Sequence, residues 1–424
     1  MRNGSTVDAA RLHRDRMSEG ISSARDARGA TGDTRTRLAI VSTHPIQYHA
    51  HWFRALASRP ELDLTVFYCY QATPADQARA GFGVEFNWDM PLLEGYRYQV
   101  LKNRGWQQPF GFFAFDTPEI RGIVAQGRYD AVLVNGWNYK AAWQTIFACW
   151  SSKTPVMVRS DSHLHTSRSM LKEAVKLPAY RIFIPRMDAC LAVGRWAREY
   201  YLHYGARDDR IFLVPHAVDE RWFQDNASRL APCRPQLRAG WKLPEDAVVF
   251  LWAAKFIPKK RPLDFLCALD GAARSGARVH GLMVGDGPLR AQSEAFARER
   301  AVPVAFAGFL NQSEMVKSYV AADTLVLPSD GGETWGLVVN EAMVCGKPCI
   351  VSDKVGCGPD LITPETGAIY PLGDVARLAE LMSEFAADRD RLRARGEAAA
   401  RKIKEYSIEV AVNGVLEAVH AIIR

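Results

Sequence analysis

Two glutamates, eight positions apart, flank the start of a predicted helix in the second half of the chain. Residues 324–327 form a short apolar strand that stops at Pro328. A glycine-rich loop then runs to Glu333, and a helix is predicted over 335–345. Free backbone N–H groups at a helix start, together with the helix dipole, favour phosphate oxygens. At a rise of 1.5 Å per residue, Glu341 stands roughly 8–9 Å along this helix. One ligand could therefore place phosphates on the loop and a polar group near each glutamate.

Each glutamate also has a purely structural explanation. An acidic side chain before a helix, such as Glu333, stabilises the positive end of the helix dipole without any ligand. Glu341 lies in a helix that is apolar nearly all round, and a buried carboxylate needs hydrogen-bond donors from the protein or from a ligand. On the residues alone, a donor elsewhere in the protein is the favoured explanation for Glu341.

A cluster of cations follows the strand predicted over 248–254. It consists of Lys255, Lys259, Lys260 and Arg261. Such a run is usually a solvated surface, but this one follows the carboxyl end of a strand and could neutralise a diphosphate. The sequence has no GxGxxG dinucleotide fingerprint, no Walker A loop and no metal-binding DxD at a strand end. We therefore predict no metal site.

Polar residues also gather at strand ends in the first half of the chain. The strand predicted over 155–160 leads directly into Asp161 and His163. Polar side chains crowded at the end of a buried strand are catalytic candidates, although a structural Asp–His pair is the alternative. Three residues near other strand ends are candidates for the acceptor side of a cleft: His44, Tyr48 and Trp137.

Length and composition indicate a two-domain globular protein. The chain has 424 residues, of which 48% are hydrophobic and 24% are charged. A net charge of +7 suits an anionic ligand or an anionic membrane surface, and nothing in the sequence indicates nucleic-acid binding. Eight scattered cysteines favour a reducing compartment. Neither a membrane-spanning run nor a signal peptide is visible, so we expect a cytoplasmic protein.

The order of strands and helices predicts an α/β fold with two Rossmann-like domains that face each other across a cleft. Residues 1–36 are polar and are expected to be a disordered tail. We predict a first, acceptor-binding domain over 37–225, a linker over 226–246 and a nucleotide-binding domain over 247–405. The last helix, within 406–424, is expected to pack back onto the first domain. Residues 81–116 form an aromatic, loop-like stretch, which is either core or a contact surface for an acceptor or membrane.

Residues 250–361 resemble the retaining glycosyltransferases of sequence family four, which have the GT-B fold. The resemblance depends on several blocks in the family's order: AKFIPKKRP at 254–262, GDGP at 285–288, FAGFLN at 306–311 and ETWGLVVNE at 333–341, which is the family's E-x7-E signature. Ala254 and Lys255 replace the usual Gly and Arg. In the first domain, VPHAVDERWF resembles the segment between the domains, with His216-Ala217 where Asn-Gly is more usual. STHPIQYHA resembles one branch of bacterial polysaccharide and lipopolysaccharide enzymes.

The resemblance implies roles for individual residues. Lys255 and Lys260 would hold the donor diphosphate, and the phosphates would also meet the backbone at the helix start. Glu341 would bind the ribose hydroxyls, which explains its burial better than a structural partner, and Glu333 would bind the donor sugar. The family's first-domain histidine has no clean counterpart, and His163 is the closest choice, with Asp161 and His44 as rivals. The implied donor contacts are Lys255, Lys260, Phe309, Glu333, Thr334, Trp335, Gly336, Leu337 and Glu341; the implied catalytic residues are His163, Asp161, Glu333 and Lys255.

The resemblance further implies transfer of a sugar, with retention of configuration, from a nucleoside-diphosphate sugar. We expect a UDP- or GDP-sugar as donor and no cofactor or metal ion. The acceptor would be a glycan, a lipid-linked molecule or a small molecule, reached from the cytoplasm with peripheral membrane contact. A catalytically silent nucleotide-sugar-binding partner, or a synthase or phosphorylase of the same fold that acts on a soluble sugar, are the alternatives.

Overall fold

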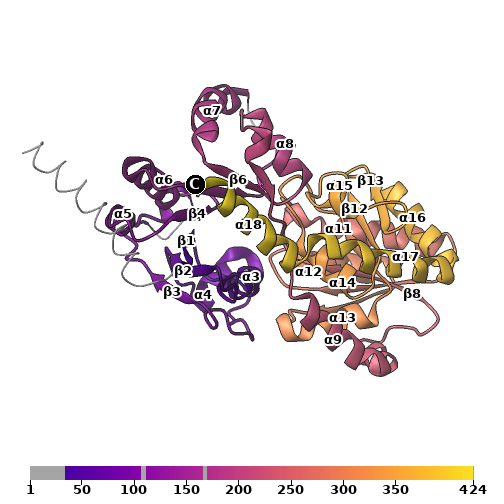
Figure 1. The fold of residues 1–424 in the computed structure, drawn as a ribbon. Coiled ribbons are helices and arrows are strands. Elements are labelled where there is room, and N and C mark those ends of the chain that lie inside the picture. The colour runs from indigo at the N-terminus through magenta and orange to yellow at the C-terminus, as the bar shows by residue number, and fades with distance from the viewer. Residues whose placement is uncertain (1–33, 107–110, 166–169, 424) are drawn as a thin grey trace, which may run out of the picture.

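The computed structural model describes residues 34–106, 111–165 and 170–423, and it contains two parallel β-sheets (Figure 1). The first has seven strands in the order β3-β2-β1-β4-β5-β6-β7, and the second has six in the order β10-β9-β8-β11-β12-β13. The first-sheet strands are β1 (Thr36–Ser42), β2 (Leu62–Tyr68), β3 (Arg97–Val100), β4 (Ala131–Asn135), β5 (Val156–Ser160), β6 (Ala189–Ala192) and β7 (Ile211–Leu213). The second-sheet strands are β8 (Val248–Ala253), β9 (Val279–Val284), β10 (Val304–Gly308), β11 (Thr324–Leu327), β12 (Cys349–Ser352) and β13 (Gly367–Tyr370).

Helices cover these sheets. Those of the first half are α3 (Gln47–Ala57), α4 (Pro74–Gln77), α5 (Ile120–Ala125), α6 (Lys140–Ser152), α7 (Met170–Phe183) and α8 (Arg195–His203). Those of the second half are α9 (Glu220–Leu230), α10 (Arg234–Gly240), α11 (Pro262–Arg274), α12 (Arg290–Arg300), α13 (Gln312–Ala321), α14 (Leu337–Val344), α15 (Gly358–Leu361), α16 (Val375–Ala387), α17 (Arg389–Lys402) and α18 (Ile408–Ile422). A short kinked segment, η1 (Ala78–Phe82), follows α4, and Gly81 within it has a φ of 96°.

Both sheets reverse their strand order in the same way, between β1 and β4 in the first and between β8 and β11 in the second. The strands that flank these points are continuous apolar runs, and β8 is buried along its whole length. Such runs are typical of parallel strands with helices on both faces. Ligands of such sheets bind at the carboxyl ends of the strands beside the reversal. The structure confirms the predicted pair of Rossmann-like domains.

The final helix, α18, packs against α3, β6 and β7 of the first domain (Figure 1). Gly414 permits this contact, because a Cβ at that position would lie 2.0 Å from the backbone oxygen of Leu213. The chain therefore crosses from the second domain back to the first. Residues 1–33 of the predicted tail, 1–36, lie outside the described residues. Its last residue, Thr36, is the first residue of β1.

Two segments contain more regular structure than the sequence suggested. The exposed edge strand β3 lies inside the stretch that was predicted to be loop-like, and all four of its residues are exposed, so no buried apolar pattern marks it. The predicted linker, 226–246, is largely helical, and α9 and α10 pack against α13 of the second domain. Proline and charge in this segment indicated a linker, but a buried arginine fixes it to the second sheet.

That arginine is Arg238. Its guanidinium donates to the backbone oxygen of Ala321 at 2.9 Å, to Asp323 Oδ2 at 2.6 Å and to the oxygens of Pro244 and Glu245, both at 3.1 Å. Its side chain is almost fully buried. A buried charge with this many acceptors is stabilising only as a complete network.

Replacing Arg238 with Met is expected to destabilise the second domain strongly, because Asp323 and several carbonyl oxygens lose a buried donor. We expect a loss of about 3–5 kcal/mol in the free energy of unfolding, measured by urea denaturation. Arg229→Met, at an exposed position of α9, is the matched control and should change that free energy by less than about 0.5 kcal/mol. Equal stability of the two variants would contradict this role of Arg238.

Among the described residues, no helix has both the length and the apolar character that a membrane crossing requires.

Candidate active site

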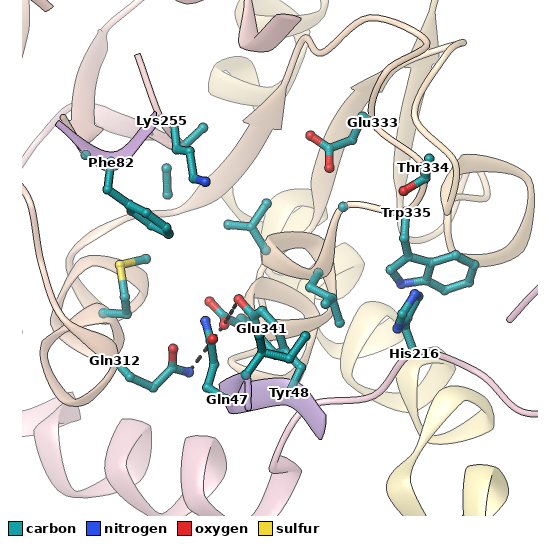
Figure 2. A pocket seen from close by; sticks show the side chains of 18 of the residues that line it. Gln47, Tyr48, Phe82, His216, Lys255, Gln312, Glu333, Thr334, Trp335 and Glu341 are labelled. Atoms are coloured by element: carbon teal, nitrogen blue, oxygen red, sulfur yellow. Dashed lines mark hydrogen bonds between the residues drawn. The ribbon is translucent and has the colours of Figure 1, made fainter. Parts of the chain in front are cut away.

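A cavity of about 510 Å³ lies between the two domains, at the carboxyl ends of both sheets (Figure 2). Both halves of the chain contribute to its wall. The first half contributes Gln47, Tyr48, His49, Phe82, Trp88, Asn135, Arg159, Asp161 and His216. The second half contributes Lys255, Lys260, Phe309, Gln312, Glu333, Thr334, Trp335, Gly336, Leu337 and Glu341. Every predicted donor-binding residue therefore lines this one cavity.

The loop before α14 turns sharply at Gly336, which has a φ of 101°. A Cβ there would lie 2.9 Å from the Leu327 side chain, so both the backbone conformation and the space require glycine. This turn starts α14 at Leu337, two residues later than predicted. Among the described residues, the N–H groups of Gly336, Leu337 and Val338 have no hydrogen-bond acceptor. They present free donors at the positive end of α14, which suits phosphate oxygens.

Lys260 and Glu333 form an ion pair across the mouth of this loop. Both side chains are mostly buried. Burial alone would raise the pKa of Glu333, but the charges of Lys260 and Lys259 outweigh it and hold this pKa below its usual value. Glu333 is therefore an ionised carboxylate, and Lys260 is a cation beside the free N–H groups of the loop.

Lys255 lies at the other side of the cavity, beside Phe82 (Figure 2). Its Nζ donates to the backbone oxygen of Ala80 at 2.7 Å and lies 3.9 Å from the centre of the Phe82 ring. Burial, followed by the charges of Lys260 and Lys259, lowers the pKa of Lys255 to about 8. An amine with this pKa is still mostly charged at neutral pH, but its charge is easily lost or restored by a change in its surroundings.

Glu341 has three donors within the protein, and Figure 2 shows two of them, Tyr48 and Gln312. Tyr319 Oη donates to Oε2 at 2.5 Å, and Tyr48 Oη and Gln312 Nε2 donate to Oε1 at 3.0 and 3.4 Å. Burial raises the pKa of Glu341, and these donors oppose that rise. Protein donors on α3 and α13 therefore accompany the burial of Glu341, as the residues alone favoured, and the ribose contact that the resemblance implies stays a prediction. Tyr48, expected on the acceptor side, contacts this donor-side carboxylate.

Asp161 lies where the two domains meet. Its Oδ2 accepts a hydrogen bond from Thr334 Oγ1 of the second domain at 2.6 Å and lies 3.9 Å from His216 Nε2. Burial would raise the pKa of Asp161, but His216 and Thr334 hold it well below its usual value. Asp161 is therefore an ionised acceptor that faces the cavity next to Glu333.

His216 is one of the cavity-lining residues that the sequence reasoning did not assign to the site. Its Nδ1 lies 3.3 Å from Nη2 of Arg159, which is held by the backbone oxygens of Val214 and Pro215. Because a guanidinium only donates, Nδ1 must accept, and the ring proton resides on Nε2, which is the nitrogen nearest Asp161. Burial and the charge of Arg159 lower the pKa of His216, so it is neutral. The signal that could have identified it is its position in the segment VPHAVD, where proteins of the resembled family more usually have asparagine.

Three predicted residues do not line the cavity. His163 is 1% exposed and packs 5.2 Å from the ring of Trp196 on α8, because the chain turns away from the sheet after Asp161. Trp137 is buried in the core, 5.6 Å from the ring of Tyr201. His44 hydrogen-bonds Thr43 Oγ1 at 3.1 Å behind the cavity wall. The assignment of His163 as the catalytic histidine, and of His44 and Trp137 to the acceptor side, is therefore corrected.

Comparisons with known proteins agree with this geometry. The family model for glycosyl transferases group 1 matches residues 234–403, and that for glycosyltransferase family 4 matches residues 47–222. A D-inositol 3-phosphate glycosyltransferase of Acidothermus cellulolyticus is 31% identical over 388 residues, which are 82% of this chain and 82% of that relative. The chain belongs to glycosyltransferase family 4.

Other relatives in this family match over shorter stretches. A GDP-mannose-dependent monoacylated alpha-(1-6)-phosphatidylinositol monomannoside mannosyltransferase of Corynebacterium glutamicum is 28% identical over 210 residues, which are 46% of this chain and 52% of that relative. The chain thus spans about half the length of the first curated relatives that it matches.

Solved structures of glycosyltransferases share the fold, and the predicted GT-B architecture is confirmed. A glycosyltransferase from Rickettsia africae superimposes with a TM-score of 0.70 at 14% identity, covering 92% of this chain and 100% of that one. The Anabaena protein HepE, solved in complex with UDP, gives a TM-score of 0.68 at 15% identity, covering 91% of this chain and 100% of that one.

Proposed function

We propose that this glycosyltransferase is a retaining, metal-independent enzyme that uses a UDP- or GDP-sugar as donor. The observation that supports this most directly is the cavity wall of the second domain. Free N–H groups at the start of α14 share this cavity with two lysines, Lys255 and Lys260, and with two carboxylates, Glu333 and Glu341. Donors and cations there match a diphosphate, and the carboxylates match hydroxyls at its two ends.

The proposed reaction needs little beyond positioning and charge stabilisation. Lys255, Lys260 and the free N–H groups of α14 stabilise the negative charge that develops on the departing diphosphate as the bond from sugar C1 to phosphate oxygen breaks. An acceptor hydroxyl attacks C1 from the same face and gives its proton to a phosphate oxygen. Asp161, ionised and bound to Thr334, accepts a hydrogen bond from a sugar hydroxyl, and His216 orients it. The products are the glycoside, with its configuration retained, and a nucleoside diphosphate.

The acceptor that we propose is a glycan, a small molecule or a lipid-linked molecule at the inner face of a membrane. The mannosyltransferase relative acts, by its name, on a phosphatidylinositol mannoside. All eight cysteines are free thiols, which supports a reducing compartment such as the cytoplasm. An aromatic edge, Trp106, Phe112 and Phe113, is exposed on the first domain next to Lys102 and Arg104. Exposed aromatic and basic side chains together suit an anionic bilayer surface.

The proposed donor class is tested by binding and turnover across UDP-, GDP-, ADP- and TDP-sugars. Wild type should bind one of these donors. Glu341→Gln should bind the same donor at least about tenfold more weakly, because a neutral amide replaces the carboxylate that is proposed to accept hydrogen bonds from the two ribose hydroxyls. Glu314→Gln, on the exposed face of α13, is the matched control and should bind normally. Product stereochemistry from NMR then separates retention from inversion. Binding without turnover with any acceptor would instead indicate a silent partner.

The low pKa of Lys255 predicts a pH dependence of donor binding. Below about 8 the amine is charged and attracts the diphosphate; as pH rises through 8 the charge is lost in the free enzyme. The dissociation constant of the nucleoside diphosphate should therefore increase above pH 8, by up to about tenfold per pH unit. Lys255→Arg keeps its charge and should give a flat profile. A flat wild-type profile between pH 7 and 9 would contradict this role of Lys255.

Membrane contact is tested by co-sedimentation with vesicles of phosphatidylcholine, with and without phosphatidylglycerol. Wild type should bind the anionic vesicles, and binding should weaken with salt. Trp106→Ala should reduce it at least about threefold, because a large exposed indole is lost from the bilayer interface. Ile369→Ala is the matched control, because it truncates an exposed apolar residue on the second domain. It should leave vesicle binding unchanged. Wild-type protein that ignores both vesicle types would remove membrane contact from the proposal.

A further inference from the structure

Residues 78–89, here called the strap, leave the first domain between β2 and β3 and lie against the second domain. The aromatic ring of Phe86 lies 4.5 Å from that of Phe309, centre to centre. Gly83 passes so close to Gly287 that a Cβ on Gly83 would lie 3.1 Å from the Gly287 nitrogen. The strap is therefore in direct contact with the turn and the strand end that form the donor side of the cavity.

The far end of the strap is fixed to the start of α13. Asn311, the N-cap residue of this helix, donates through Nδ2 to the backbone oxygen of Asn87 at 2.7 Å. The carboxylate of Asp89 accepts from the Ser313 backbone N–H at 3.2 Å and from its hydroxyl. A carboxylate at a helix N-terminus satisfies free N–H groups and opposes the helix dipole, so this contact stabilises the closed arrangement of the domains.

The near end of the strap holds Lys255. Its ammonium group donates to Ala80 and lies over the face of Phe82, so both of these partners belong to the first domain. A partly buried cation over an aromatic ring is a favourable contact. A donor diphosphate would compete with these partners for the same ammonium group.

Glu341 is covered in the same way by Tyr48, which comes from α3 of the first domain. The residue is only 2% exposed, and Oε1 already has two donors. A ribose hydroxyl that binds this oxygen competes with these two protein donors. Gln312 belongs to the second domain with Glu341, so Tyr48 is the donor that domain opening removes.

We propose that Tyr48 and the strap form an interdomain latch, which occupies Glu341 and Lys255 while no donor is bound and which the donor displaces when it binds those groups. This inference rests on the proposed function, because it assigns both residues to the nucleoside-diphosphate site. The latch keeps the ligand-free cleft closed with its charges satisfied. Its contacts must be given up when the donor binds, so a weaker latch means tighter binding of the nucleotide.

The first measurement needs no ligand. Hydrogen exchange of the strap is compared in wild type, Tyr48→Phe and Asp89→Ala, and both variants should exchange at least about threefold faster, because each loses one contact between the domains. Two matched controls should not change strap exchange. Tyr319→Phe removes the other hydroxyl from Glu341 but within the second domain, and Glu85→Ala removes an exposed strap carboxylate that has no partner among the described residues.

The second measurement is the dissociation constant of UDP and of GDP by calorimetry. Tyr48→Phe and Asp89→Ala should bind the preferred nucleotide about threefold to tenfold more tightly than wild type. Unchanged strap exchange in both variants would overturn the latch. Binding that weakens in Tyr48→Phe would also overturn it, because Tyr48 would then support Glu341 as a ligand contact rather than compete with the ligand.

The two measurements separate this inference from the proposed function. If neither nucleotide binds wild type or any variant, the donor assignment fails, and with it the displacement of the latch by donor. Faster strap exchange in the variants would then show a closing contact between domains with no link to a nucleotide. If the nucleotide binds equally to wild type and both latch variants, the proposed donor stands and the latch is rejected.

Discussion

The central constraint on this structure is that the charged groups at the facing strand ends are buried and must have partners. Ionised carboxylates and ammonium groups are costly to bury without partners. Lys260 therefore pairs with Glu333, and Lys255 donates to the backbone oxygen of Ala80 in the strap. Glu341 accepts hydrogen bonds from three protein donors. Each of these partners is one that a ligand could replace. The groups that we propose for the diphosphate and the sugar hydroxyls thus also help to hold the two domains together.

The segment between the domains shows the same principle in the backbone. Asn340, which lies between the two signature glutamates in sequence, donates to the backbone oxygen of His216 at 3.0 Å and accepts from the indole of Trp335 at 2.9 Å. On the other side, Arg159 holds the oxygens of Val214 and Pro215. The chain leaving the first sheet is therefore clamped by a buried side chain from each domain. This places His216 and Asp161 against the α14 loop with little freedom, as a reaction that depends on positioning requires.

Sequence reasoning predicted the second-domain half of the site well, because its parts are local. A strand, a glycine loop and a helix determine where Glu333 and Glu341 point, and a strand end determines the place of Lys255. It failed where contacts join distant residues. Tyr48 and Glu341 are 293 positions apart, and nothing in either segment indicates the other. His163 was preferred because it follows a buried strand, yet the position of a side chain two residues beyond a strand depends on the next turn, which packs it on Trp196.

These failures fall mainly in the first domain, and that has a physical reason. On the proposed function, the second domain binds a diphosphate and a ribose, which are common to many donors, so its residues fall into recurring local patterns. On the same proposal the first domain must fit an acceptor, and this task depends on loops that cross the cleft. Here His216 stands where the resemblance has asparagine, and the strap carries an aromatic wall, Phe82, Phe86 and Trp88, to the edge of the donor pocket. Substitutions in the strap and around His216 should therefore alter specificity while the second domain still binds the nucleotide.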